Sequence, residues 1–179
     1  MTQIATVYAQ ALYDLAREEA AAEAVLSQLQ TLQESFSAEP DFLRLLSTPA
    51  ISKEERCRII DDCFSGKLHP YILNFMKILA EKGYMRHFED CCTAFETQYN
   101  LDHGILVVTA LSAYPLTADQ LTRLTKKLEA ITGKQIRLRN RTDETVLGGI
   151  RLDYDGKQLD DTLQHRLDDM GKLLKNTVL

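Results

Sequence analysis

Three arginines near the end of the chain have a spacing that could bind an anionic partner. Arg137, Arg139 and Arg141 alternate with other residues in the segment 135–141, so in an extended strand their side chains project from one face. Such a row fits an acidic protein partner. The favoured interpretation is an edge strand whose charge resists aggregation. Nucleic acid is disfavoured, because no interleaved aromatic residues offer a stacking surface.

Four thiols are the next candidates for chemistry, and all of them fall in helical patterns: Cys57, Cys63, Cys91 and Cys92. The adjacent pair cannot hold one metal as a C-x-x-C turn does, and no histidine stands at ligand spacing from it. The pattern favours reduced thiols packed in the interior of an intracellular protein. A metal site is the alternative.

The remaining titratable groups do not form a recognisable catalytic set. The histidines are scattered, at His69, His87, His103 and His165. The carboxylate pairs are sequence neighbours, as in Asp61-Asp62, so on a helix the two side chains diverge by about 100°. No phosphate-binding loop, nucleophile elbow or zinc-protease motif is present. The sequence therefore predicts neither an enzyme nor a cofactor or metal centre.

Composition describes an ordinary globular chain with an uneven charge. The 179 residues are 45% hydrophobic and 26% charged, with a formal net charge of −5. Residues 1–105 carry 9 Lys and Arg against 16 Asp and Glu, a net charge of −7, whereas residues 106–179 carry a net charge of +2. The acidic first half disfavours a nucleic-acid footprint there. No leader or membrane-spanning pattern is recognised, and we expect a cytoplasmic protein.

The first 103 residues have the apolar period of helices. Six short helices are expected, with Pro40 and Pro70 in the first turns of the third and fifth. Ser52 and Glu55 predict a capping box at the start of the fourth. Gly83 suits the end of the fifth. We predict a six-helix bundle over residues 1–103.

The period changes at Gly104. Residues 105–111 are rich in strand formers, 117–133 predict a helix with a Thr117–Gln120 capping box, and 135–141 alternate as a strand. The Gly148-Gly149 pair and Asp155-Gly156 indicate a β-hairpin, and a terminal helix follows from Leu163 to Leu174. The predicted fold class is α+β and predominantly helical, with a small α+β domain over residues 104–179 in which the first strand pairs with the hairpin.

The first and fifth helices invite two interpretations. Ala5, Ala9 and Ala16 make parts of the first helix small enough for close approach, and Asn74 interrupts an otherwise apolar fifth helix. Apolar stripes of this kind usually pack inside a bundle. The alternative is a groove that receives an amphipathic helix from another protein.

Taken together, these residues resemble the delta subunits of F-type ATP synthases, a family that includes the mitochondrial oligomycin-sensitivity-conferring protein. The resemblance rests on the opening from Tyr8 to Ala16, on Pro49-Ala-Ile51, on Ala113-Tyr-Pro115-Leu116, and on Asp143-x-x-Val-Leu-Gly148-Gly149 followed by Leu159-Asp160-x-Thr162. It covers essentially the whole chain in order. Two positions depart from the family pattern: Tyr84 stands where arginine is usual, and Thr162 where serine is usual.

The resemblance implies two protein partners. The N-terminal helix of an alpha subunit would bind between the first and fifth helices, a role that falls on Tyr8, Ala11, Leu12, Leu15, Asn74 and Ile78. The b subunits of the peripheral stalk would bind the C-terminal domain, in the region of Gly148, Gly149 and Asp160. Locally, the two glycines also fit a backbone bend and Asp160 a helix N-cap.

The implied function is that of a non-catalytic stator subunit of a bacterial enzyme, which ties the catalytic head to the b subunits so that the head does not turn with the rotor. Its membrane association would be indirect, on the cytoplasmic side of the inner membrane. The alternative is a free-standing helical adaptor that binds an acidic partner through Arg137, Arg139 and Arg141.

Overall fold

The computed structural model describes residues 3–48, 50–143, 146, 149–154 and 157–160. It divides into two compact units, Met1–Tyr99 and Asn100–Leu179, and we describe each by itself. The division falls inside a helix, four residues before the one expected from the sequence. The domain bounds 1–103 and 104–179 stay a prediction.

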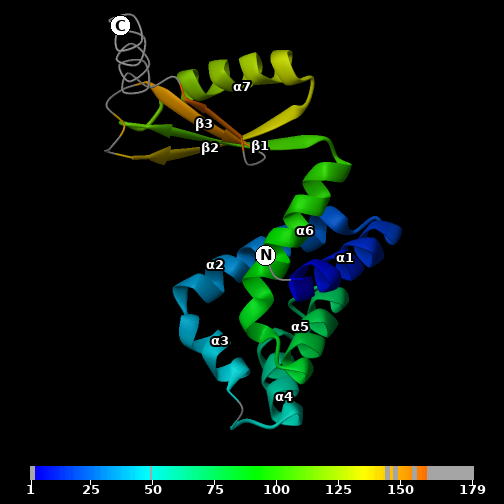
Figure 1. The fold of residues 1–179 in the computed structure, drawn as a ribbon. Helices are drawn as coiled ribbons and strands as arrows, with labels where there is room; N and C mark the ends of the chain where they lie inside the picture. The colour runs from blue at the N-terminus through cyan, green and yellow to red at the C-terminus, as the bar shows by residue number, and fades with distance from the viewer. Residues whose placement is uncertain (1–2, 49, 144–145, 147–148, 155–156, 161–179) are drawn as a thin grey trace, which may run out of the picture. The chain divides into compact units, whose positions relative to one another are not determined.

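The first unit consists of helices joined by short turns (Figure 1). Their bounds are α1 Gln3–Glu18, α2 Ala22–Ala38, α3 Pro40–Ser47, α4 Lys53–Phe64, α5 Pro70–Lys82 and α6 Phe88–Asp102, with the short 3-10 helix η1, Met85–His87, before α6. The six expected helices are confirmed. The 3-10 turn was not predicted, because a single tight turn leaves no periodic signal.

The ends of these helices follow local chemistry, with one difference from expectation. Gly83 ends α5 in the left-handed conformation, at a φ of 73°, as predicted. At the start of α4 the Ser52 hydroxyl accepts a hydrogen bond from the Glu55 N–H at 3.2 Å. In the described residues the Ser52 N–H does not donate in return to the Glu55 carboxylate, so only half of the predicted capping box is formed.

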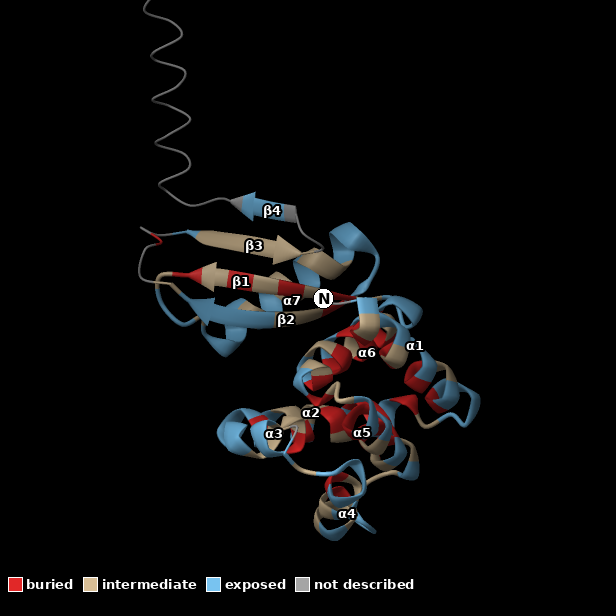
Figure 2. Ribbon diagram, turned by 60° about the horizontal axis from the view of Figure 1, so that its bottom comes forward, coloured by how far each residue is buried: buried red, intermediate tan, exposed pale blue. Residues whose placement is uncertain are grey.

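Aromatic side chains form much of the helical core. Phe36 lies at the centre, with its ring 5.1 Å from Phe88 and 5.5 Å from Phe42 between centroids. Tyr13 meets Phe95 edge-on at 5.4 Å, a geometry that aromatic rings prefer. The buried residues line the inward sides of the helices (Figure 2). The α6 stripe expected from the sequence is buried throughout: Phe88, Cys91, Cys92, Phe95 and Tyr99.

The second unit is a mixed four-stranded sheet in the order β2-β1-β3-β4 (Figure 2). The strands are β1 Ile105–Ser112, β2 Gln135–Thr142, β3 Ile150–Tyr154 and β4 Lys157–Asp160, with α7, Ala118–Thr132, between β1 and β2. β1 pairs parallel with β2 and antiparallel with β3. The pairing of the first strand with the hairpin is confirmed, and so is the fold class.

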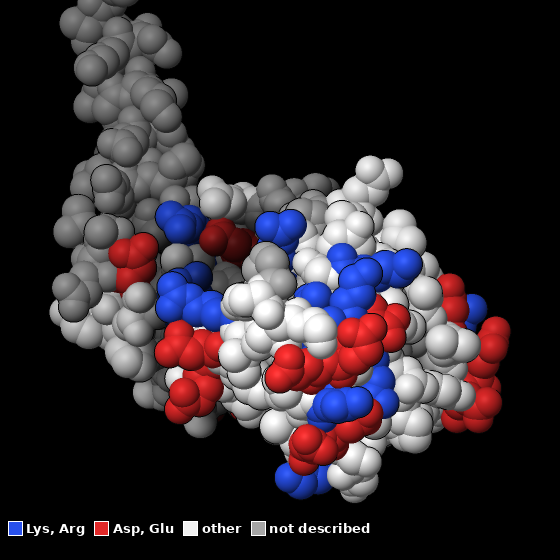
Figure 3. Space-filling view, turned by 90° about the horizontal axis from the view of Figure 1, so that it is seen from below, with Lys and Arg blue, Asp and Glu red and all other residues white. Residues whose placement is uncertain are grey.

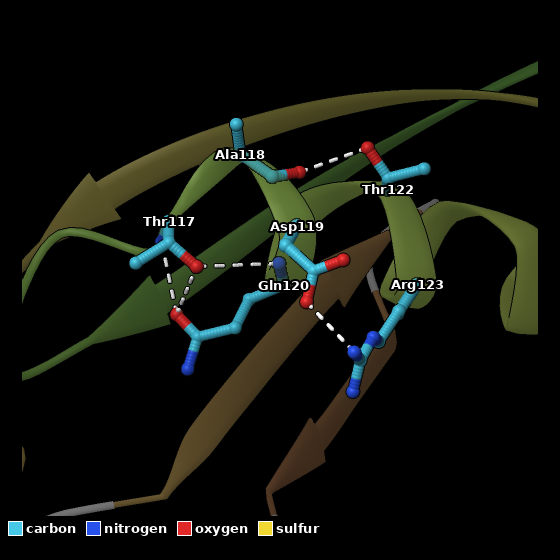
Figure 4. A network of polar contacts seen from close by, with 6 residues as sticks. All are labelled: Thr117, Ala118, Asp119, Gln120, Thr122 and Arg123. Carbon is cyan, nitrogen blue, oxygen red and sulfur yellow. Dashed lines mark hydrogen bonds and ion pairs between the residues drawn. The ribbon is translucent and has the colours of Figure 1, made fainter.

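A complete capping box begins α7 (Figure 4). The Thr117 hydroxyl accepts from the Gln120 N–H at 3.3 Å, and the Gln120 side-chain oxygen accepts from the Thr117 N–H at 2.9 Å. Asp119 and Arg123 add an exposed ion pair at 3.0 Å. These bonds satisfy amides that a helix start leaves without intrahelical partners, and they fix where the chain turns back over the sheet.

α7 covers one face of the sheet. Leu106, Val108 and Ile136 form the buried centre, with Leu128 of α7 packed against them and Leu138, Leu152 and Tyr154 completing the layer. Because α7 covers one face of the sheet, and successive residues of a strand point to opposite faces, β1 alternates between buried and half-buried residues. The Asp155-Gly156 turn and the expected terminal helix over 163–174 lie outside the described residues.

Candidate partner-binding surfaces

One side of α1 packs in the core of the helical unit, whereas solvent reaches the adjoining side. Ala5, Ala9, Leu12, Tyr13 and Ala16 are buried. Tyr8, Ala11 and Leu15 follow one another at helical spacing on the adjoining side. Tyr8 is half-buried, Ala11 is exposed and Leu15 is 49% exposed. Solvent therefore reaches three of the four α1 residues expected to bind a partner, while the fourth, Leu12, belongs to the core.

α5 shows the same division. Its core side carries Ile72, Phe75, Met76, Leu79 and Ala80. Asn74 and Ile78 stand one turn apart and are both exposed, Ile78 by 44%. α1 and α5 contact each other. We call the half-buried Tyr8 and the exposed residues Ala11, Leu15, Asn74 and Ile78 the α1–α5 strip.

The polar residues of α5 differ in role. The Lys77 ammonium lies 2.6 Å from an Asp61 carboxylate oxygen and thereby links α5 to α4. Asn74, the other polar interruption of the helix, is exposed. An asparagine that is buried in an apolar contact between two helices can fix their register. Asn74 can act in this way only when a partner helix covers it.

Tyr84 lies beside the α1–α5 strip, although no pattern in the sequence predicted its place there. Its ring meets the Tyr8 ring nearly edge-on, with centroids 6.0 Å apart and planes inclined at 68°. Its backbone N–H donates to the Leu79 carbonyl at 2.7 Å, as part of the turn that Gly83 allows. The sequence singled out Tyr84 only as a departure from the family pattern, and as an aromatic residue directly after a helix-ending glycine.

In the second unit the expected stalk-binding residues are only partly described. Gly149 has a φ of 87° and lines a cavity of about 1000 Å³ together with Ser112, Tyr114, Gln120, Val146 and Ile150. Tyr114 is 82% exposed beside it. Gly148 lies outside the described residues. Asp160 pairs with Arg151 in the strand register, and its side chain is not described.

The arginine row occupies an edge strand, as one interpretation of the sequence required. β2 ends the sheet order. Arg139 and Arg141 are exposed and Arg137 is half-buried. On the face of the molecule seen in Figure 3, acidic and basic side chains are interspersed and form no single-sign patch.

The thiols are placed for packing. Cys91 and Cys92 are buried, and Cys57 and Cys63 are half-buried. Burial raises the pKa of Cys91 to about 11 and raises the pKa of Cys92 further. Among the residues that the structure describes, no group of three or more His, Cys, Asp or Glu side chains could hold a metal ion. In that same part of the chain, no helix has the length and apolar character to span a bilayer.

Comparison with known proteins decides the family. The family model described as the ATP synthase delta (OSCP) subunit matches residues 4–174. The chain belongs to the ATP synthase delta (OSCP) family. It is thus a peripheral-stalk subunit of an F-type ATP synthase, with a structural rather than a catalytic role.

Individual relatives match along almost their whole length. ATP synthase subunit delta of Clostridioides difficile is 29% identical over 98% of this chain and 97% of its own length. The delta subunit of Alkaliphilus oremlandii is also 29% identical, over 96% of both chains. A chain of the Toxoplasma gondii mitochondrial ATP synthase hexamer has the same fold, with a TM-score of 0.75 at 22% identity over 97% of this chain and 98% of that one.

Proposed function

We propose that the α1–α5 strip binds the N-terminal helix of the ATP synthase alpha subunit. The strongest support is the exposure of Leu15 and Ile78, 49% and 44%, on two helices that contact each other in a chain of the delta family. An amphipathic helix laid along the strip would remove these side chains from water. Full burial of an exposed side chain of this kind contributes about 1.5–3 kcal/mol, so burying the exposed half of Leu15 or Ile78 contributes about 0.7–1.5 kcal/mol.

Each residue of the strip has a distinct part in this proposal. Leu15 and Ile78 provide the apolar contact, and Ala11 lets the partner backbone approach closely. Asn74 provides a hydrogen bond that sets the register of the incoming helix. Leu12, which is 4% exposed, supports the strip from the core side and contacts the partner less than its neighbours do.

We propose further that the second unit binds the b subunits near Gly148, Gly149 and Asp160. The support is the large cavity beside Gly149 and the exposed Tyr114 ring next to it. An aromatic ring with an apolar body and a polar tip is a common anchor in protein interfaces. Gly148 and Asp160 are included in this proposed binding region only because of the family resemblance.

Two separate attachments suit the task of a stator. Proton-driven rotation of the rotor exerts torque on the catalytic head, and the head stays still only if it is tied to the stalk. Once one unit is bound, the second binding event becomes intramolecular, so two modest contacts hold as one strong contact. We place the protein in the bacterial cytoplasm, on the inner membrane, and attached to it only through the complex.

A binding measurement tests the first attachment. A synthetic peptide with the alpha-subunit N-terminal sequence from the same cell should bind the full chain in calorimetry. Ala11→Asp should weaken that binding at least tenfold, because it places a charge where the backbones meet. Ala24→Asp is the matched control, since Ala24 is an exposed alanine of α2 and the same substitution there should change nothing. Equal affinity for the wild type and Ala11→Asp would refute the proposal.

A further inference from the structure

The α1–α5 strip has two different ends, and the contact between Tyr8 and Tyr84 marks one of them. The centroids of the two rings lie 6.0 Å apart, so the first half of α1 lies beside the end of α5. From Tyr8 to Glu18, where α1 ends, the helix axis rises about 15 Å at 1.5 Å per residue. We call the end at Tyr8 and Tyr84 the tyrosine end of the strip.

A lysine borders the strip at the tyrosine end. Lys82 follows Ile78 by four residues, so it continues the exposed row of α5 by one turn. It is exposed and stands two residues before Tyr84. Lys82 also borders a small pocket beside α4, but in the described part of the chain it forms no ion pair. The neighbouring Glu81 faces α4, where its carboxylate lies 3.9 Å from the Cys57 Sγ. The charge on the strip side of this end is therefore positive.

Two carboxylates border the strip at its other end. Glu18 and Glu19 come three and four residues after Leu15 and are both exposed, so they continue the exposed row of α1. The Glu19 N–H still donates to the Leu15 carbonyl at 3.4 Å. The neighbouring Arg17 lies 3.9 Å from Asp14 of its own helix, whereas the two glutamates form no ion pair among the described residues. We call this end the glutamate end.

The strip thus has apolar side chains along its length, a positive border at one end and a negative border at the other. Helices usually carry carboxylates in the first turn and cations in the last turn, because these side chains offset the partial charges of the helix ends. A helix of this kind complements the strip in only one direction. With its first turn at the tyrosine end, opposite charges meet at both borders, whereas in the reverse direction like charges meet.

The partial charges of the helix backbones do not change this direction. At the tyrosine end the start of α1 lies beside the end of α5, so their own partial charges have opposite signs and offset each other. The bare ends of the incoming helix favour the reverse direction, but each is equivalent to only about half a unit charge. One carboxylate in the first turn and one cation in the last turn outweigh them.

We propose that the α1–α5 strip binds its helix in a single direction, parallel to α1. The helix has an acidic first turn beside Lys82 and a basic last turn beside Glu18 and Glu19. This inference rests on the proposed attachment of the alpha subunit and adds the charge pattern and the direction of the bound helix. The direction decides where the remainder of the partner chain leaves the surface, which is at the glutamate end, beside the turn from α1 to α2.

Paramagnetic broadening measures the direction on the full chain. A synthetic peptide with the alpha-subunit N-terminal sequence from the same cell carries a maleimide-linked nitroxide on a cysteine added at its first or its last residue. With the label first, the amide signals of Lys82 and Tyr84 should lose at least threefold more intensity than those of Leu15 and Glu18. With the label last, the ratio should be inverted.

The outcomes separate the direction from the attachment itself. The opposite broadening pattern, or equal broadening at the two ends with either label, would overturn the proposed direction while leaving the attachment intact. A peptide that does not bind the wild-type chain would instead refute the attachment on which the direction depends.

Exchanging the border charges tests their part in the binding. Lys82→Glu with Glu18→Lys keeps the net charge and should weaken the alpha-subunit peptide at least threefold at about 50 mM salt, with a smaller loss at high salt because exposed charges are screened. Glu34→Lys with Lys127→Glu makes the same exchange on exposed residues of α2 and α7 and should change the affinity less than twofold.

A neutral pair keeps the charge test usable if the exchanged pair does not fold. Lys82→Gln with Glu18→Gln should cause a smaller loss of affinity in the same direction. Equal affinity of the wild type and the folded border variants, or an equal loss in the control pair, would show that the border charges do not set the direction.

Discussion

The ring of Tyr84 lies edge-on against the ring of Tyr8, 6.0 Å away between centroids. This contact joins the second residue after α5 to the side of α1 that carries Ala11 and Leu15. The aromatic pair lies at the candidate binding strip.

The Tyr8–Tyr84 pair should contribute measurably to stability. Edge-to-face aromatic pairs are worth about 0.5–1.5 kcal/mol beyond the area they bury. In a double-mutant cycle of Tyr8→Ala and Tyr84→Ala, we expect a coupling free energy of that size from urea unfolding. Tyr84→Arg should lose the coupling as Tyr84→Ala does. A coupling indistinguishable from zero would show that the rings only lie near each other.

Leu12 and Leu15 should separate stability from binding. Leu12 is 4% exposed and Leu15 is 49% exposed on the same helix. Leu12→Ala should lower the free energy of unfolding by about 2–5 kcal/mol, as buried leucines do. Leu15→Ala should leave unfolding nearly unchanged and weaken the alpha-subunit peptide about tenfold, by about 1.4 kcal/mol. The reverse pattern would contradict the assignment of Leu15 to the strip.

Replacing the hydroxyl residues that cap the starts of α7 and α4 should lower the free energy of unfolding by different amounts. Thr117 takes part in two reciprocal bonds with Gln120, whereas Ser52 makes one bond with the Glu55 amide. Thr117→Ala should therefore cost about 1–2 kcal/mol of unfolding free energy and Ser52→Ala about 0.5–1 kcal/mol. Thermal unfolding of the two single variants compares them. A larger loss at Ser52 would speak against the structure at these helix starts.

Gly133 should resist substitution because of its backbone and not because of its surroundings. Its φ is 66°, and an added Cβ would meet no atom within 4 Å. Gly133→Ala should destabilise by about 1–2 kcal/mol, since the left-handed region is costly for L-residues. Gly133→Asn should cost less, because asparagine tolerates that region better. Chemical denaturation measures both.

The buried thiols should make the protein sensitive to alkali. Burial raises the pKa of Cys91 from 9.0 to about 11, so the folded state favours the neutral thiol more than the unfolded state does. The stabilisation is complete below about pH 9 and is lost as the pH rises through 11. Cys91→Ala should reduce this alkaline loss in urea titrations. At pH 8, iodoacetamide should modify Cys91 and Cys92 only after unfolding.

Sequence patterns predicted the elements better than they predicted the surfaces. The stripe Phe88 to Tyr99, the Thr117 cap and the Gly83 end depend on residues close in sequence, and all were confirmed. Tyr84 was missed, because its contact with Tyr8 requires two helices to be packed first. The family resemblance grouped Leu12 with Tyr8, Ala11 and Leu15, and helical spacing alone does not show on which side of a partly apolar stripe the core ends.

The surroundings of the arginine row in the sheet were predictable only in part. Alternation placed Arg137, Arg139 and Arg141 on one side of a strand, but the identity of their neighbours depends on long-range pairing. The parallel register of β1 with β2 and the antiparallel register of β3 supply Val107, Leu111 and Arg151. No local pattern in the sequence encodes those distances.

α6 ends at Asp102 and β1 begins at Ile105, so the covalent path from the helical unit to the sheet has two connecting residues, His103 and Gly104. Flexible linkers lengthen by redistributing many torsion angles. The two-residue connection has too few torsion angles to lengthen in this way. When the stalk holds the head against torque, this covalent connection can therefore yield only through a few backbone torsions at one point. Lengthening of the connecting segment contributes little.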